Sequence, residues 1–176
     1  DMLRQASINE GQLWFEGIPL TSERVKKLIN VRLMECDCVA QHTIVAGGEQ
    51  ACDPHNEGSG PLPAHRSIIF DVFPRSATNR YFADMSRTVV RGTASAELKR
   101  LYKVVLDAQE EAITKIKDGA DGKRIHQGIC SRFEKAGYKT GLVNGRMQGY
   151  FHGTGHGVGL DIHEMPRISR TGSLLQ

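Results

Sequence analysis

The sequence contains no uninterrupted apolar run of about 18 residues, so it predicts no membrane-spanning helix. Its 4 cysteines show no C-x-x-C spacing and no dense framework, which argues against a secreted disulfide scaffold and fits a reducing, cytoplasmic compartment. The net charge of +3 is small and the basic residues are dispersed among acids, so we expect no nucleic-acid or membrane partner. Internal repeats and low-complexity tracts are also absent. What remains is a globular domain of ordinary composition.

The N-terminal part of the chain changes character after its first apolar residues. Residues 1–19 hold apolar positions without a clean period, so we expect a lead-in segment and linker there, and a domain over residues 20–176. A helix is expected after Thr21, which is a suitable N-cap, with Val25 on its buried side. The β-branched run over residues 38–46 predicts a strand that a pair of glycines ends.

Two short apolar runs, residues 67–73 and 81–90, predict a β-hairpin because a short turn-like connection joins them. A turn in the middle of that connection places Asp71 directly opposite Asp84 on one face of the sheet. Like charges that face each other destabilise a sheet, so a shared proton, bound cations or arginine partners must relieve the pair. The candidate arginine partners are Arg75, Arg80 and Arg87.

Two helices follow the hairpin. Apolar side chains recur at spacings of three and four over residues 98–116, which predicts an amphipathic helix that ends near Gly119. A second helix is expected over residues 122–136, with His126 off the apolar stripe and therefore at the surface. Because consecutive strands join by a short turn, we expect an α+β fold in which helices cover one face of an antiparallel sheet.

The segment from Phe151 to Arg167 gathers three histidines, His152, His156 and His163, around four alternating glycines. Each glycine inside a helix costs about 1 kcal/mol relative to alanine, so we expect extended or looped backbone that lines a pocket. A glycine-rich turn with incidental surface histidines is the alternative.

Two aspartates and a histidine form a donor set that suits Mn, Co, Fe or Zn, and a bridging carboxylate suits two ions. Two ions about 3.5–4 Å apart can hold a hydroxide between them and polarise a carbonyl, which is hydrolytic chemistry. Further histidines nearby could then move protons or hold substrate. A metal-free arrangement, in which the aspartates pair with arginines, is also open.

Three stretches of the sequence resemble the pita-bread metallopeptidases (M24 type), which include aminopeptidase P, prolidase and methionine aminopeptidase. These stretches are FDVFPR around Asp71, ADMSRT around Asp84 and HGTGHGVGLDIHE from His152 onward. The phrase TIVAGGEQACDPHN, which contains His55, falls where that family keeps a substrate-facing histidine. The resemblance covers about residues 16–167 and implies the creatinase/aminopeptidase-like form of the α+β fold.

The resemblance also implies a metal centre. In the family pattern Asp71 binds one metal ion, Asp84 bridges both ions and His156 binds the other. The implied cofactors are two divalent ions, Mn, Co or Zn, in the complete protein. The implied reaction is hydrolysis of peptide bonds at the N-terminus of a peptide substrate by a hydroxide that bridges the two ions. A homodimer is expected from the resemblance alone.

Other histidines take catalytic and substrate-binding roles in the same pattern. His163 is expected to act on the scissile peptide as a proton shuttle or electrophile, and His152 is the second expected catalytic residue. His152 and His55 are expected to line the substrate side. A histidine four residues before the metal-binding His156 is similar to the proline-specific branch, whereas methionine aminopeptidases usually lack it, so Xaa-Pro bonds are the expected substrate.

The family pattern includes two more glutamate ligands, on strands that follow the His-rich segment, and Glu164 is not a match for either. We therefore expect a partial catalytic domain, incomplete at its C-terminal end, that binds one ion or none and is impaired as an enzyme. The alternatives that stay open are a methionine aminopeptidase, a non-catalytic pita-bread binding module and a creatinase-like amidinohydrolase.

Overall fold

The computed structural model describes residues 1–176, which form two compact units. Unit 1 consists of Asp1–Leu98 together with Gly159–Ile162, and unit 2 consists of Lys99–Val158 together with His163–Gln176. All paired strands in both units are antiparallel. No helix has the length and apolarity that crossing a membrane requires.

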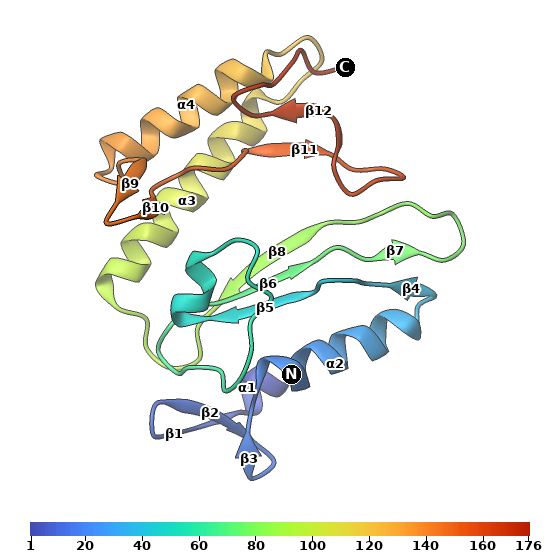
Figure 1. The fold of residues 1–176 in the computed structure, drawn as a ribbon, viewed down its shortest axis with the longest axis vertical. Helices are drawn as coiled ribbons and strands as arrows, with labels where there is room; N and C mark the ends of the chain where they lie inside the picture. Colours follow the sequence, from blue (N-terminus) through green and yellow to red (C-terminus); the bar gives the residue numbers. More distant parts are fainter. The chain divides into compact units, whose positions relative to one another are not determined.

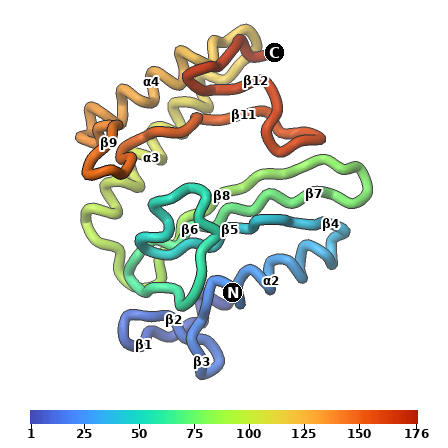
Figure 2. The backbone as a smooth tube through the Cα atoms, in the orientation of Figure 1, coloured from blue at the N-terminus to red at the C-terminus, as the bar shows by residue number.

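The first residues of unit 1 are folded, which corrects the expectation of a linker over residues 1–19. A short helix, α1 (Met2–Gln5), precedes a three-stranded sheet of β1 (Ser7–Asn9), β2 (Gln12–Phe15) and β3 (Ile18–Pro19), traced in Figure 2. Each strand connection is a Glu-Gly pair in which both residues have positive φ, the geometry that a two-residue hairpin turn needs. The side chains of Leu13 and Leu20 are fully buried, so this segment contributes to the core.

Helix α2 (Ser22–Met34) begins where the sequence predicts it. Thr21 is its N-cap, and the Thr21 side chain accepts a hydrogen bond from the backbone N–H of Arg24 at 3.3 Å. The helix lies beside β4 (Cys38–Val39) and β5 (Ile44–Gly47) (Figure 1). The single strand expected over residues 38–46 is therefore two strands with an irregular break between them.

The predicted hairpin is present in unit 1. Strands β6 (Ile68–Val72) and β8 (Met85–Val89) pair with each other, and β6 also pairs with β5, so that β6 is central in the sheet β5-β6-β8. Within the connection, β7 (Arg75–Ser76) pairs with β4. A 3-10 helix, η1 (Gly48–Cys52), follows β5. The buried core of this unit is formed by Ala6, Leu13, Leu20, Val25, Val45, Leu62, Ala64 and Ile68.

Unit 2 is built on the helices α3 (Ala96–Lys115, of which residues 99–115 belong to this unit) and α4 (Gly122–Lys135). Asp121 caps α4 by accepting hydrogen bonds from the backbone N–H groups of Lys123 and Arg124. Two hairpins complete the unit: β9 (Gly141–Val143) with β10 (Arg146–Gln148), and β11 (Gly155–Gly157) with β12 (Glu164–Ile168). Its core consists of Ala108, Ala112, Ile125, Ile129, Phe133, Ile168 and Leu175.

The predicted apolar stripe of α3 is only partly buried. Ala108 and Ala112 are buried, whereas Tyr102, Val105 and Ile116 are exposed. The buried positions on α3 are the small ones, because a helix with alanine at its contact face lets a neighbouring element approach closely. The larger apolar side chains of the stripe lie outside this contact.

Candidate functional site

The acid pair in unit 1 has a different register from the predicted one. Asp71 on β6 lies opposite Ser86 on β8, not opposite Asp84. The Ser86 hydroxyl donates a hydrogen bond of 2.5 Å to Oδ1 of Asp71. Asp71 forms no ion pair in the described chain, so the arginine-paired arrangement is not what this structure shows for Asp71.

The turn of the hairpin explains the shift. The backbone N–H of Ser76 donates to the carbonyl of Tyr81 at 2.9 Å, so a four-residue loop joins the two strand ends. The Ser76 side chain accepts hydrogen bonds from the backbone N–H groups of Thr78 and Asn79, which is the usual way a serine initiates a turn. Arg80 closes the loop with φ +67°. The turn is therefore centred one residue later than the middle of the connection.

A one-residue shift of the turn centre moves the facing partner by two residues, and this keeps the two acids on one face. Side chains alternate between the faces of a strand with period two, so Asp84, two residues before Ser86, belongs to the side that carries Asp71 and Ser86. Diagonal neighbours of this kind have Cα atoms about 7–8 Å apart, within reach of two carboxylates that share ions. The hairpin thus presents two oxygen donors and a supporting hydroxyl together.

In unit 2, two of the predicted histidines lie side by side. His156 stands on β11 and His163 directly precedes β12, and their ring centroids are 4.4 Å apart at an interplanar angle of 77°. Nδ1 of His156 is 3.0 Å from the carbonyl of Gly157. Because a carbonyl only accepts, Nδ1 is the donor of this hydrogen bond and carries a proton. A neutral ring protonated at Nδ1 is the tautomer that suits a metal ligand through Nε2.

The glycines of this segment have unequal roles. The register of β11 and β12 is irregular between His156 and Gly157, where Gly157 faces Glu164. A Cβ added to Gly157 would lie 2.4 Å from the carbonyl oxygen of Met165, so the close approach of the two backbones requires glycine. A Cβ on Gly155 would meet no atom closer than 3.8 Å. Gly157 is therefore the position that holds the His-rich segment against β12.

His152 is exposed, and its surroundings are aromatic. Its Nδ1 donates to the carbonyl of Gly153 at 2.8 Å, and its ring lies 4.9 Å from the ring of Tyr150. Tyr150 in turn stacks on Phe133 of α4, with ring centroids 4.6 Å apart. The stack connects the start of the His-rich segment to the core of unit 2.

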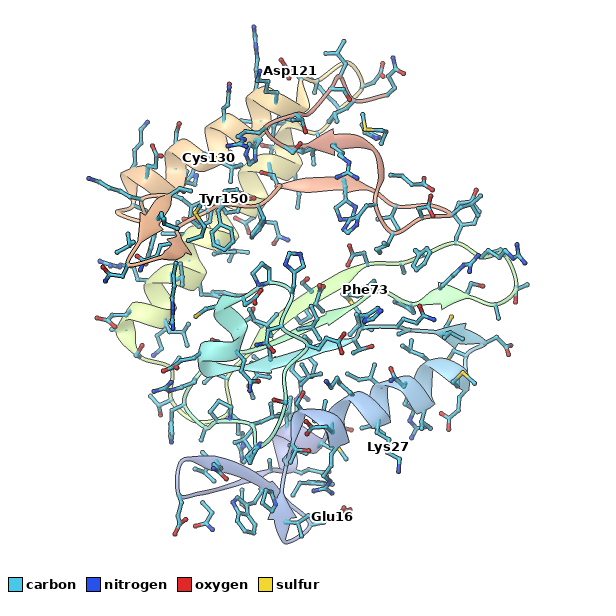
Figure 3. All side chains as sticks on the ribbon, viewed as in Figure 1. Glu16, Lys27, Phe73, Asp121, Cys130 and Tyr150 are labelled. Carbon is cyan, nitrogen blue, oxygen red and sulfur yellow. The ribbon has the colours of Figure 1, made fainter.

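A partly buried hydrogen-bond network holds the middle of the segment. Thr154 lies between His152 and His156 in the sequence, and its hydroxyl contacts Nδ1 of His126 at 2.9 Å and the Tyr150 hydroxyl at 3.0 Å. His126 is buried, so the expectation of a surface residue is wrong. Its position on α4 is next to the apolar stripe, and packing of Tyr150 and Thr154 over α4 extends the buried face to include it. Figure 3 labels Cys130 and Tyr150, which flank this network.

Burial sets the protonation of the network. It lowers the pKa of His126 from its ordinary value, with smaller contributions from His152 and Arg170, so the ring is neutral at pH 7. Burial raises the pKa of the Tyr150 hydroxyl and of the Cys130 thiol, whose Sγ is 3.5 Å from Nε2 of His126. A thiol with a raised pKa is a poor nucleophile, so Cys130 is a structural residue here and not a catalytic one.

His55, the predicted substrate-side histidine of unit 1, lies in the loop after η1. Its side chain is 94% exposed, and its Nδ1 is 4.0 Å from Oδ1 of Asp53. The same carboxylate oxygen accepts a hydrogen bond from the backbone N–H of His55 at 2.9 Å, which turns the loop locally. The ring is therefore presented to solvent on a short, ordered turn.

The expected metal ligands belong to different units. Neither unit by itself brings together three His, Cys, Asp or Glu side chains in a metal-holding group. Unit 1 holds Asp71 and Asp84, which the hairpin register assigns to one sheet face, and unit 2 holds His156, whose Nδ1 is the hydrogen-bond donor. Two carboxylates and an Nε2 donor fit divalent ions of the Mn, Co or Zn type by their chemistry.

Sequence reasoning missed the residues that support these donors. Ser86 carried a signal, since it is two residues after Asp84 in an extended stretch and therefore belongs to the same face. His126 carried a weaker one, because its i+4 neighbour Cys130 lies beside the Ile129 stripe and widens the apolar face. Thr154 and Tyr150 had no local signal, because the contact that anchors Thr154 is with His126, 28 residues away, and the role of Tyr150 depends on its packing against α4.

The sequence and this fold match a known family. The family model for metallopeptidase family M24 matches residues 4–176, so the chain belongs to this family. Its fold is the pita-bread fold of the prolidases and aminopeptidases, an α+β fold with antiparallel sheets, as the sequence predicted.

Individual relatives and solved structures are also similar to this chain. The chain is 31% identical over 129 residues to the Xaa-Pro dipeptidase of Pyrococcus furiosus, an alignment that covers 73% of this chain and 34% of that protein. It is similar to the solved prolidase from Pyrococcus furiosus, with a TM-score of 0.79 and 26% identity over 90% of this chain and 45% of that one. It is also similar to the X-Pro aminopeptidase from Thermotoga maritima, with a TM-score of 0.77 and 30% identity over 89% and 43%. The chain thus spans about a third of the curated relative's length.

Proposed function

We propose that the protein containing this chain is a metal-dependent exopeptidase that hydrolyses Xaa-Pro bonds at the N-terminus of peptides. The observation that carries this proposal is the register of the hairpin, which assigns Asp71 on β6 and Asp84 directly before β8 to one face, in a chain of family M24. Similarity to an Xaa-Pro dipeptidase and to an X-Pro aminopeptidase supports the proline-specific branch. Manganese and a cytoplasmic location belong to the same proposal.

The proposed metal ligands are Asp71, Asp84 and His156. Ser86 supports the first of them, because its hydroxyl donates to Oδ1 of Asp71 and leaves Oδ2 to coordinate. The carbonyl of Gly157 supports the third, because it fixes the proton on Nδ1 of His156. When bound, divalent ions supply Lewis-acid polarisation of the peptide carbonyl and lower the pKa of water.

The remaining histidines are proposed to handle the substrate. His163, whose ring lies edge-on to that of His156, is proposed to hold or move the proton at the nitrogen of the leaving amine. His152 is proposed to contact the substrate near the scissile bond from its aromatic support on Tyr150. His55 is proposed to contact the substrate from the exposed loop after η1.

Turnover with matched peptides tests the proposal. The purified protein that contains this chain is incubated with Mn(II) and either an Ala-Pro or a Met-Ala peptide, and the released N-terminal residue is measured. We expect Ala-Pro to be cleaved with the higher kcat/KM. Faster cleavage of Met-Ala would favour a methionine aminopeptidase. Mn(II) uptake without cleavage of either peptide, or no uptake at all, would favour a non-catalytic binding module.

A further inference from the structure

A cavity in unit 1 continues the face that carries the two acids. It has a volume of about 450 Å³ and is lined in part by Val39, Phe73, Phe82 and Ile162. The segment that brings Ile162 is fastened to the hairpin, since the backbone N–H of Phe82 donates to the carbonyl of Gly159 at 2.8 Å. The cavity therefore lies within one compact unit and has a largely apolar floor.

The register of the hairpin places this cavity beside the acids. Phe73 is two residues after Asp71, and Phe82 is two residues before Asp84, so period-two alternation puts both rings on the face of the acids. The bridge between Arg75 and Phe82 shows that the register continues past the end of β6. Two residues of extended strand span about 7 Å, so each ring lies about that distance along the hairpin from the nearer acid.

Two arginines line the same cavity. Nε of Arg75 donates to the carbonyl of Arg80 at 3.1 Å, and the Arg75 guanidinium carbon lies 5.8 Å from the centroid of the Phe82 ring. Neither Arg75 nor Arg80 forms an ion pair in the described chain. The histidine of the lining, His42, already contacts Oε1 of Glu57 at 2.7 Å through its Nδ1. The cavity thus carries two guanidinium groups that form no salt bridge with a protein carboxylate.

We propose that this cavity, the Arg75–Arg80 pocket, binds a substrate carboxylate on a short apolar stem. The inference rests on the proposed peptidase function and names its substrate class: peptides with a carboxylate within one or two residues of the cleaved bond. The aromatic floor takes the methylene groups of the stem, and the two guanidinium groups donate hydrogen bonds to the carboxylate oxygens. The carboxylate belongs either to an acidic side chain or to the C-terminus of a short peptide.

Binding measured without metal or turnover tests the pocket by itself. The wild-type protein carries ¹³C-methyl labels on Ala77 and Ile162, both of which line the pocket, and is titrated with four peptides. Glu-Pro amide and Gln-Pro amide differ only in the side-chain charge, whereas Ala-Pro and Ala-Pro amide differ only in the C-terminal charge. We expect the charged member of one pair to bind about tenfold more tightly, the size of one charge-assisted contact. Equal binding within both pairs overturns the proposal.

Variants assign the effect to the pocket. Arg80→Asn removes the charge at a residue with φ +67°, a conformation that asparagine tolerates, and is expected to reduce the tenfold preference to less than about twofold. Arg87→Asn is the matched control, because Arg87 faces Phe70 and therefore lies on the opposite face of the same hairpin. An unchanged preference in Arg80→Asn, or an equal loss in Arg87→Asn, contradicts the pocket.

The two proposals fail in different ways. If the protein prefers the charged peptide, loses this preference in Arg80→Asn and cleaves no peptide, the pocket proposal is supported and the peptidase proposal is contradicted. Cleavage of Ala-Pro peptides with equal binding of all four titrated peptides leaves the peptidase and removes the pocket.

Discussion

Units 1 and 2 hold their candidate functional side chains in different ways. In unit 1, Asp71 stands on β6 and Asp84 directly precedes β8, so the register of the antiparallel hairpin, which continues to the Arg75–Phe82 bridge, sets their spacing. In unit 2, His152 and His156 stand on a glycine-rich segment. Hydrogen bonds of Thr154 with His126 of α4 and with Tyr150 hold this segment in place. The ladder tolerates a change of side chain at its surface, whereas the anchored segment depends on buried polar contacts.

This difference predicts that a substitution in unit 1 can weaken metal binding without lowering the free energy of unfolding. Asp84→Asn is expected to weaken Mn(II) binding by at least about 100-fold, since even residues that only support a metal ligand contribute about 10–100-fold. The free energy of unfolding should change by less than about 0.5 kcal/mol, because Asp84 is exposed. Titration calorimetry with Mn(II) and urea unfolding measure the two effects.

The control for this prediction is Asp37→Asn, at an exposed unit 1 residue with φ +51° outside the proposed ligand set. Its Mn(II) affinity should match that of the wild type. If Asp84→Asn takes up Mn(II) as the wild type does, Asp84 is not a ligand and the acids of unit 1 have another role.

Unit 2 should instead lose stability when its segment is altered. Gly157→Ala places a Cβ 2.4 Å from the Met165 carbonyl oxygen, so the backbone must move. Overpacking of this kind costs about 1–3 kcal/mol, which urea unfolding should detect. Gly155→Ala on the same strand meets nothing closer than 3.8 Å and should unfold like the wild type. Equal losses in the two variants would show that the strand as a whole resists side chains, and not the contact with β12.

The anchoring network is tested by removing one hydroxyl. Thr154→Val keeps the shape of the side chain but takes away the partner of His126 Nδ1 and one of the two acceptors of the Tyr150 hydroxyl, which keeps its contact with the carbonyl of Gly153. Leaving buried polar atoms unpaired costs about 1–3 kcal/mol. Thr171→Val, where the hydroxyl lies in an exposed contact with Ser169, should change the free energy of unfolding by less than about 0.5 kcal/mol. A neutral Thr154→Val would mean that the segment is held by backbone contacts alone.

The same network predicts a pH dependence that belongs to unit 2. The pKa of His126 is lower in the folded state than its ordinary value of 6.5, chiefly because burial disfavours the charged ring. The unfolded state then binds more protons, so the free energy of unfolding is highest above about pH 6.5 and falls as the pH drops through that value towards the folded pKa. Urea unfolding between about pH 7 and pH 5 should show this fall, and His126→Gln should reduce its slope. An unchanged slope in the variant would exclude His126 as its source.

Removing a surface ion pair of unit 2 has the smallest expected effect on the free energy of unfolding. This variant tests whether the loss of any charged contact would destabilise unit 2 as much as the loss of the Thr154 contacts. Lys103 and Asp107 pair on the outer side of α3, with the lysine side chain 68% exposed. Lys103→Gln should lower the free energy of unfolding by no more than about 0.5 kcal/mol, because exposed pairs are weak. A loss as large as that of Thr154→Val would contradict the distinction between the buried network and surface charge.

Local sequence patterns predicted much of the fold. Four predictions depend on neighbours within a few residues: the N-cap at Thr21, the hairpin, the two amphipathic helices and the family resemblance. The structure and the family match confirm them. Period-two alternation was also sufficient to place Asp71 and Asp84 on one face, because that relation survives any even shift of register.

Contacts between distant residues lay beyond those patterns. Packing of Thr154 and Tyr150 against α4 buries His126, although His126 lies outside the apolar stripe of that helix. The register of the hairpin is a local effect of another kind, because the hydrogen bonds of the Ser76 turn, which the apolar pattern of the strands does not specify, place Asp71 opposite Ser86. The chain's composition and motifs by themselves define the class of donors and the family. The partner of each donor, and the pocket beside the acids, arise only when segments far apart in sequence meet, because hydrogen-bond geometry and close packing act between whole elements and are not encoded in any single stretch.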